Sequence, residues 1–264
     1  MCRHLAYLGP PRSLYELVLA PQHSLLRQSY APADMRGGGT INADGFGIGW
    51  YTEGRTEPSR YRRACAMWTD ETLPDLTRDT RSGAVLAAAR SATVGMPVVE
   101  TAAAPFRSGR WLFSHNGVVP GWPDAVEDLA EALPARALMT LDAPTDSALL
   151  WALLRARLDA GEDPAKAVGK LVLDVVRAAP DARMNLLLTD GRQLVATAWY
   201  HALSVLTGDD FVAVSSEPWD DDQRWRGVPD RHLVAATVGA DGPVVEMCLL
   251  DEKSEADEDI QGGR

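Results

Sequence analysis

Apolar residues recur along the chain in two different periods, which predict strands, then helices, then strands again. Short apolar runs predict strands at 2–8, 44–51, 84–90 and 111–115, and a second set at 184–189, 193–199, 203–206, 211–215, 232–238 and 244–250. Between these sets, apolar residues at helical spacing predict helices at about 122–133, 145–160 and 164–178. Asp-Gly or Gly-Asp pairs join the later strands as antiparallel neighbours, so the order of elements predicts an α+β fold.

Local signals set the boundaries of several elements. Gly9-Pro10-Pro11 is expected to end the first strand. Ser13 followed by Glu16 has the spacing of a capping box and predicts a short helix directly afterwards. The three glycines at 37–39 predict a flexible turn.

Residues 44–51 read DGFGIGWY, in which glycine alternates with a large apolar residue. This alternation predicts a strand whose glycine side lies close to a neighbouring backbone. The glycines do not have the spacing G-x-G-x-x-G and no helix follows them, so a dinucleotide-binding loop is excluded.

Composition and charge exclude several classes of protein. The 264 residues carry a net charge of −11 with a pI near 4.9, which has the wrong sign for binding nucleic acid or anionic membranes. No stretch approaches the roughly 20 apolar residues that span a bilayer, and the N-terminus has no export signal. We therefore predict a cytoplasmic protein with one domain at 2–250, followed by an acidic, solvated tail at 251–264.

The cysteines and histidines predict neither a disulfide framework nor a metal site. Cys2, Cys65 and Cys248 have no C-x-x-C spacing, and the five histidines are scattered singly. The expected chemistry uses no metal and no other cofactor.

Cys2 directly follows the initiator Met1. Removal of the methionine would give Cys2 a free α-amine, whose pKa in model compounds is about 7.7–8.0, so that nucleophile and base belong to one residue. A coincidental strand cysteine is the alternative that this feature alone leaves open.

Three further segments follow in order: RSATVG at 90–95, HNG at 115–117 and TDS at 145–147. Together with Cys2 and DGFGIGWY, they make the chain resemble the class II glutamine amidotransferases, which belong to the N-terminal nucleophile (Ntn) hydrolases. The resemblance extends from Cys2 to about Leu250. It implies an αββα sandwich, in which two antiparallel sheets lie between layers of helices.

The resemblance also implies roles for individual residues. Cys2 would be the nucleophile, and the Asn116 amide with the Gly117 backbone N–H would form the oxyanion hole. Arg90, with the Thr93 hydroxyl, would bind the α-carboxylate of the substrate. Asp146 would pair with the α-ammonium group. Preorganised donors of this kind stabilise the charge that forms on a carbonyl oxygen during amide hydrolysis.

Structural alternatives stay open for several of these residues. Asn116-Gly117 is also typical of a hairpin turn, and Arg90 of a surface ion pair. Thr145 or Asp146 could cap the helix that follows. His115 is expected to be structural.

Two features indicate a stand-alone hydrolase. Glutamine-using members of the family commonly have histidine where this chain has Val94, and no synthase domain that would consume ammonia is found in the sequence. The chain is most similar to the γ-glutamyl amidohydrolases of ergothioneine biosynthesis, which remove glutamate from γ-glutamyl-hercynylcysteine sulfoxide.

The segment SSEPW at 215–219, with Arg224-Trp225 shortly afterwards, supports this finer similarity. Trp219 and Trp225, with the acids at 220–222, are predicted to bind the trimethylammonium group of the leaving fragment. The alternative is that they form a packed surface corner.

The expected function is hydrolysis of a γ-glutamyl amide in a small-molecule substrate, through a thioester on Cys2. A glutaminase subunit that supplies ammonia to a separate synthase is one alternative, and a catalytically silent protein that binds glutamyl ligands is another. The sequence predicts no oligomeric state.

Overall fold

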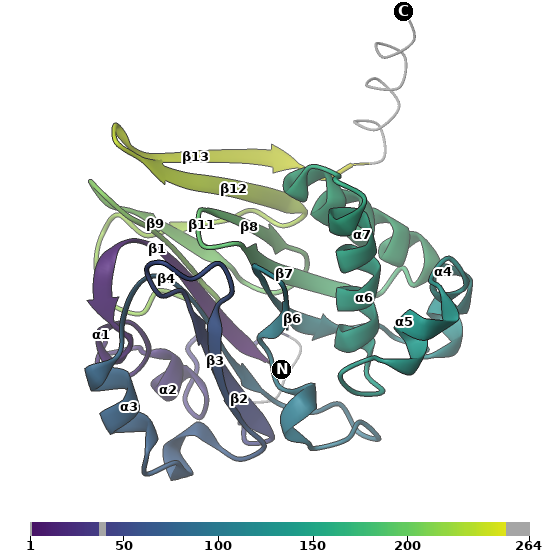
Figure 1. The fold of residues 1–264 in the computed structure, drawn as a ribbon, viewed down its shortest axis with the longest axis horizontal. Helices are drawn as coiled ribbons and strands as arrows, with labels where there is room; N and C mark the ends of the chain where they lie inside the picture. Colours follow the sequence, from purple (N-terminus) through teal and green to yellow (C-terminus); the bar gives the residue numbers. More distant parts are fainter. Residues whose placement is uncertain (1, 37–40, 252–264) are drawn as a thin grey trace, which may run out of the picture.

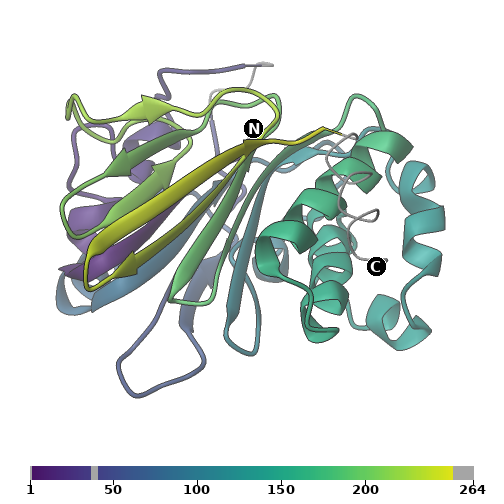
Figure 2. The same cartoon turned by 90° about the horizontal axis from the view of Figure 1, so that it is seen from above.

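The computed structural model describes residues 2–36 and 41–251, and in these residues two antiparallel sheets pack face to face with helices on both outer sides (Figures 1 and 2). This arrangement confirms the predicted α+β sandwich. The seven-stranded sheet has the order β11 (Arg226–Gly227), β9 (Ser204–Thr207), β10 (Val212–Ser215), β1 (Arg3–Ser13), β4 (Arg81–Arg90), β2 (Gly45–Trp50) and β3 (Ser59–Arg63). The six-stranded sheet has the order β13 (Gly242–Leu249), β12 (His232–Gly239), β8 (Gln193–Ala198), β7 (Arg183–Thr189), β6 (Trp111–Val118) and β5 (Phe106–Ser108).

Each sheet has its own layer of helices. The helices on the side of the seven-stranded sheet are α1 (Leu14–Val18), α2 (Leu25–Gln28) and α3 (Leu73–Asp79). Those on the side of the six-stranded sheet are α6 (Asp146–Asp159) and α7 (Pro164–Ala178), with α4 (Glu127–Glu131) and α5 (Ala135–Met139) packed against α6. Single 3₁₀ turns lie at Met67–Thr69, Glu100–Ala102 and Asp124–Val126.

The alternation of side chains along β1 decides which residues face the other sheet. Leu5 and Tyr7 pack in the apolar cluster under α1 to α3, whereas Ala6 and Leu8 pack in the cluster between the two sheets. Because successive residues of a strand point to opposite faces, the even-numbered residues at the start of β1 lie on the inter-sheet side.

Three helices begin at residues with side-chain caps, and the first of these caps was predicted from the sequence. Ser13 and Glu16 form both hydrogen bonds of a capping box at the start of α1. The Thr145 side chain accepts from the Ala148 N–H at the start of α6, and the Asp163 side chain accepts from the Lys166 N–H at the start of α7. These bonds satisfy backbone donors that the first turn of a helix leaves free.

The glycine side of β2 does face a close neighbour, as predicted. A Cβ at Gly47 would lie 2.3 Å from the carbonyl oxygen of Ala104, and one at Gly49 would lie 2.6 Å from Leu112. The missing side chains let β2 approach the six-stranded sheet closely.

Two boundary predictions were wrong. β1 does not end before Gly9 but continues to Ser13, with a shift in its register against β4 between Leu8 and Arg12. The pairing with β10 reaches only as far as Leu8, so the prolines remove no hydrogen bond on that side. The predicted helix at 122–133 is a 3₁₀ turn followed by the five-residue α4.

Some predictions fall outside the described residues. The turn at 37–39 does so entirely, and of the acidic tail at 251–264 only Asp251 is described. Just before it, Leu250 is buried, its N–H donates to the Arg231 carbonyl, and it packs against α7.

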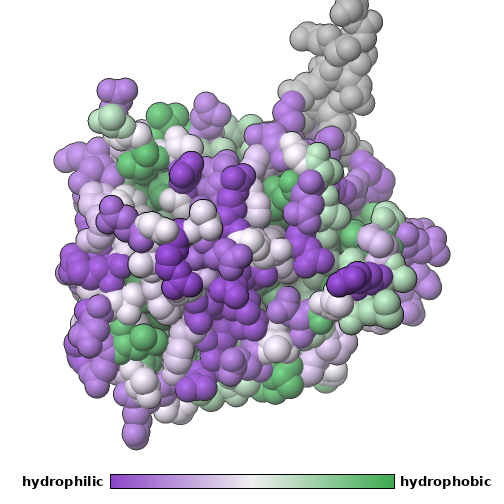
Figure 3. Space-filling view, viewed as in Figure 1, coloured by the Kyte–Doolittle hydropathy of each residue, from purple (hydrophilic) through white to green (hydrophobic). Residues whose placement is uncertain are grey.

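The outer surface agrees with the composition. The face seen in Figure 3 is mostly hydrophilic, with hydrophobic residues scattered in small groups. None of the helices in residues 2–36 and 41–251 is long and apolar enough to cross a membrane.

Candidate active site

Cys2 lies at one end of the sandwich, immediately before β1, and is partly buried. Its Sγ lies 3.7 Å from the carbonyl oxygen of Ser91. The thiol opens onto a small cavity that is lined by Cys2, Ala88, Ala89, Arg90, Ala102, Ala104, Phe106, His115 and Ser147. The structure therefore brings together one residue from each of four segments that the sequence analysis singled out: Cys2, Arg90, His115 and Ser147.

Arg90 is the last residue of β4 and is one of the residues that line this cavity. Its guanidinium donates to the Pro97 carbonyl at 2.9 Å, and its own carbonyl accepts from the Asp44 N–H at 3.0 Å. An arginine has five N–H donors, so the bond to Pro97 leaves others for a ligand. No ion pair of Arg90 is found in the described part of the chain, so the alternative of a surface ion pair is not what the structure shows.

The loop after Arg90 does not bring every predicted residue to the cavity. Its start is fixed by the Ala92 N–H, which donates to the Asp44 carboxylate at 2.8 Å. Thr93 is exposed and does not line the cavity, and Val94 is fully exposed to solvent.

Asn116 and Gly117 lie inside β6, where they pair with Asn185 and Met184 of β7. The alternative of a hairpin turn at Asn116-Gly117 is therefore wrong. Asn116 is completely buried, yet neither its amide nitrogen nor its amide oxygen has a hydrogen-bonding partner among the described residues. Buried amides without partners are rare and costly, so this one has unused hydrogen-bonding capacity, although Asn116 is not among the residues that line the cavity.

Position 117 has room for no side chain. A Cβ there would lie 1.7 Å from the Arg183 carbonyl oxygen and 2.4 Å from the His115 ring. Glycine at this position lets β6 approach its neighbours without distortion.

Asp146 connects the start of α6 to the end of β6. One carboxylate oxygen accepts from the Ser147 N–H at 2.7 Å, and the other accepts from the Val119 N–H at 3.1 Å. Thr145, not Asp146, is the N-cap residue. Asp146 is buried beside the cavity without lining it, and each of its oxygens has capacity for a further donor.

His115 and Ser147 line the cavity, and neither was assigned a role in binding or catalysis from the sequence. The ring of His115 donates from Nε2 to the Arg183 carbonyl at 2.9 Å, and its Nδ1 lies 2.9 Å from the Ser147 hydroxyl. Because both ring nitrogens are engaged, the contacts agree with the structural role expected for His115. The position of Ser147 directly after Asp146 was the only sequence signal for its place in the cavity.

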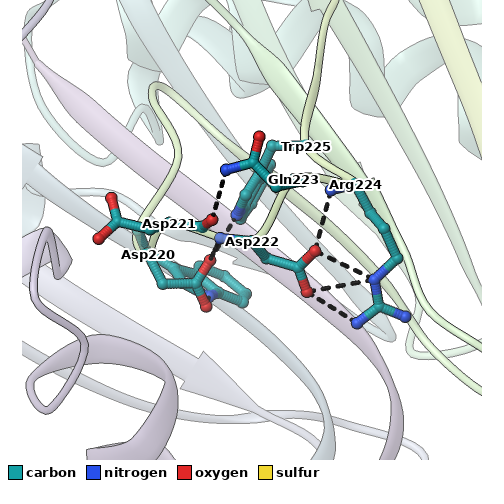
Figure 4. Close-up of polar contacts among 7 residues, drawn as sticks. Asp220, Asp221, Asp222, Gln223, Arg224 and Trp225 are labelled. Carbon is teal, nitrogen blue, oxygen red and sulfur yellow. Dashed lines mark hydrogen bonds and ion pairs between the residues drawn. The ribbon is translucent and has the colours of Figure 1, made fainter.

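Trp219 and Trp225 are not brought to the cavity. Both pack in the apolar cluster under α1 to α3, on the face of the seven-stranded sheet that points away from the six-stranded sheet, with their rings edge to face at 5.2 Å. Both indole N–H groups donate to the Asp220 carboxylate, and Arg224 forms a bidentate ion pair with Asp222 (Figure 4). These contacts are those of a packed corner, and binding of a leaving fragment by the two tryptophans stays a prediction.

Residues 2–36 and 41–251 contain no group of three or more His, Cys, Asp or Glu side chains that could hold a metal ion. The Cys2 thiol and the Arg90 guanidinium line the cavity, and the Asp146 carboxylate and the unpartnered Asn116 amide lie next in sequence to its lining residues Ser147 and His115. This combination suits binding of an amino-acid head and nucleophilic attack on a carbonyl.

Comparisons with known proteins agree with this chemistry. Residues 25–208 match the family model described as glutamine amidotransferases class-II, and this range includes Arg90, Asn116, Gly117 and Asp146 but not Cys2. The chain belongs to the class II glutamine amidotransferases. The fold also matches that of a glutamine aminotransferase class-II domain protein from Silicibacter pomeroyi, with a TM-score of 0.65 and 25% identity over 93% of this chain and 98% of that one.

More similar sequences come from mycobacteria. The chain is 43% identical to the γ-glutamyl-hercynylcysteine sulfoxide hydrolase of Mycolicibacterium smegmatis, over 89% of this chain and 95% of the relative. It is also 43% identical to the protein of the same name from Mycobacterium tuberculosis strain CDC 1551, over 90% of this chain and 93% of the relative. The predicted enzyme class, a hydrolase, is confirmed by these relatives.

Two buried histidines near the site make stability depend on pH. Burial lowers the pKa of His4 and of His201 to about 3, and nearby positive charge adds to the effect. In the unfolded chain both groups return to a pKa near 6.5. As the pH falls from 6.5 towards 3, the unfolded chain therefore takes up protons that the folded protein does not, and the free energy of unfolding decreases.

We expect each of the two groups to contribute a slope of up to about 1.4 kcal/mol per pH unit in that window. Urea unfolding of the wild type and of His201→Gln at pH 6.5, 5.5 and 4.5 measures this effect. The variant should lose stability less steeply with acid. Identical slopes for the two proteins would contradict the prediction.

Proposed function

We propose that the protein hydrolyses a γ-glutamyl amide through a thioester on Cys2, and that its substrate is γ-glutamyl-hercynylcysteine sulfoxide. The observation that supports the reaction is that a thiol lines a cavity whose lining includes His115, the residue directly before Asn116, and that the buried Asn116 amide has no partner in the described structure. The identity of 43% over 89% of the chain to a hydrolase of this substrate supports the choice of substrate.

The reaction begins after removal of Met1. The α-amine of Cys2 accepts the thiol proton, and the thiolate attacks the γ-carbonyl carbon of the substrate. The negative charge that forms on the carbonyl oxygen is stabilised by the Asn116 side-chain N–H and the Gly117 backbone N–H.

The intermediate then collapses in two stages. The protonated α-amine returns its proton to the leaving nitrogen, and hercynylcysteine sulfoxide departs with its amine, leaving glutamate bound to Sγ as a thioester. A water molecule loses a proton to the same α-amine, attacks the thioester, and releases glutamate and the free thiol.

Recognition of the glutamyl head is assigned to the charged groups around the cavity. Arg90 would hold the α-carboxylate with the N–H groups that Pro97 does not occupy, and Asp146 would hold the α-ammonium. Thr93 would add its hydroxyl from the loop that follows Arg90. Because a catalytic thiol must remain reduced, we place the reaction in the cytoplasm.

The substrate choice predicts a large preference over free glutamine. If contacts to the leaving fragment are used in the transition state, kcat/KM for the sulfoxide conjugate should exceed that for glutamine by at least ~100-fold, or about 2.7 kcal/mol. A competition assay that measures both substrates in one mixture decides the point. Equal values for the two substrates would favour a subunit that supplies ammonia to a synthase, and failure to turn over either would favour a silent binding protein.

Trp225→Ala serves as the second arm of this assay. A loss confined to the conjugate would support contact between Trp225 and the leaving fragment, which must then pass around the end of the seven-stranded sheet. An equal loss on both substrates would show that Trp225 only packs against Trp219 and Asp220.

A further inference from the structure

A buried hydrogen bond connects the two sheets just behind the candidate nucleophile. His4 of β1 crosses the space between the sheets, and its Nδ1 lies 3.2 Å from the Ser114 hydroxyl of β6. Both residues are inaccessible to solvent, with 0% and 1% of their surfaces exposed. A buried polar pair of this kind is structurally demanding, because either partner alone would be left unsatisfied.

The spacing along the two strands places this bond beside the reacting groups. Asn116 lies two residues after Ser114 in β6, so these two side chains share one face of that strand, and Cys2 lies two residues before His4, directly before the first residue of β1. The candidate nucleophile thus directly precedes a strand of the seven-stranded sheet, and the amide donor belongs to the six-stranded sheet. No backbone ladder fixes the distance between them, because the two sheets are not hydrogen-bonded to each other as strands.

His4 is held firmly enough to transmit that spacing. Its backbone N–H donates to the Ser216 hydroxyl at 3.0 Å, and its carbonyl accepts from the Ser216 N–H at 2.9 Å. Burial lowers the pKa of His4 to about 3, so the ring stays neutral at the pH where the α-amine of Cys2 acts as a base. Ser216, from the SSEPW segment, therefore has a role that the sequence alone did not supply.

We propose that His4 and Ser114 are positioning residues, whose hydrogen bond sets the distance between the Cys2 thiol and the Asn116 amide. This inference rests on the proposed function. Oxyanion donors act within a narrow range of about 2.7–3.1 Å, and a misplacement of about 1 Å can cost on the order of 100-fold in rate. The bond contributes to kcat by fixing the distance between the two sheets on either side of the reacting carbonyl.

Ser114→Ala tests the proposal with a small change in volume. On a γ-glutamyl anilide we expect kcat to fall on the order of 10- to 100-fold with KM little changed, since the residue touches no substrate. Ser114→Thr keeps the hydroxyl and should recover most of the rate. The matched control is Thr189→Val, which removes another buried hydroxyl of the same sheet, bonded to Gln193 at the far end of β7, and should leave kcat unchanged.

A double-mutant cycle distinguishes positioning from general loss of stability. In the Asn116→Ala background, Ser114→Ala should cause little further loss of kcat, because the donor that it positions is already absent. Losses that multiply in the double variant, or a wild-type kcat for Ser114→Ala, would overturn the proposal. The proposed function is judged separately, because its failure would show as no glutamate release by the wild type itself.

Discussion

Replacing Cys2 by alanine is expected to abolish hydrolysis of γ-glutamyl amides while the protein remains folded. The thiol supplies the bond that becomes the thioester, and no other group at the cavity replaces it. Among the described residues, the polar contact of the thiol is the 3.7 Å approach to the Ser91 carbonyl, so little stability is lost with it. Glutamate release measures the activity, and thermal unfolding followed by circular dichroism measures the fold.

The same mechanism requires a free α-amine on Cys2, so we expect the intact mass of the active protein to lack Met1. Cys65→Ala and Cys248→Ala are the controls and should keep full activity. Cys65 packs against the cluster under α1 to α3, and Cys248 is exposed on β13. Near-normal turnover by Cys2→Ala, or full activity of protein that retains Met1, would rule out the N-terminal nucleophile.

Elements with strong local signals were predictable from the sequence. α6 and α7 begin where Thr145 and Asp163 provide side-chain caps, and β2 follows the alternation of glycine with apolar residues. In these cases the local preference and the burial in the sandwich agree, which is why the pattern was sufficient.

Elements that depend on distant partners were missed or misplaced. β3 reads SRYRR, which has no apolar alternation, and it forms because β2 offers an edge to pair with. α4 and α5 bury none of their residues, so no apolar stripe marked where each begins and ends. In β1, the end of the pairing with β10 at Leu8 is what allows prolines to follow within the strand.

In the candidate site, too, single residues were predictable from local motifs, whereas contacts between distant residues were not. Motifs pointed to Cys2, Arg90 and Asn116 one by one, but the pairing of Asn116 with Asn185 inside a strand depends on residues far away in sequence. The bond between His4 and Ser114 joins two sheets across 110 positions of the chain, which no local pattern indicates. The segment with Trp219 and Trp225 shows a further limit, because a motif does not say on which face of a sheet its side chains pack, and binding of the leaving fragment by these tryptophans stays a prediction.

Asn116→Ala is expected to lower kcat by on the order of 100- to 1000-fold, with a much smaller change in KM. The donor is matched to negative charge that exists only in the transition state, so its removal leaves binding of the neutral amide almost unchanged. The fold should survive, because the Asn116 amide has no partner in the described structure that would be left unsatisfied. Steady-state kinetics on a γ-glutamyl amide, with the melting temperature measured in parallel, provides the test.

Arg90→Ala is the informative comparison, because it removes a group assigned to binding and not to the transition state. Its guanidinium lines the cavity and should hold the α-carboxylate equally in the ground state and in the transition state, so its loss should raise KM more than it lowers kcat. Asn116→Ala should therefore act mainly on kcat, and Arg90→Ala mainly on KM. A large rise in KM with unchanged kcat for Asn116→Ala would contradict the oxyanion role, and would instead make the unpartnered amide between the sheets a binding group for the substrate.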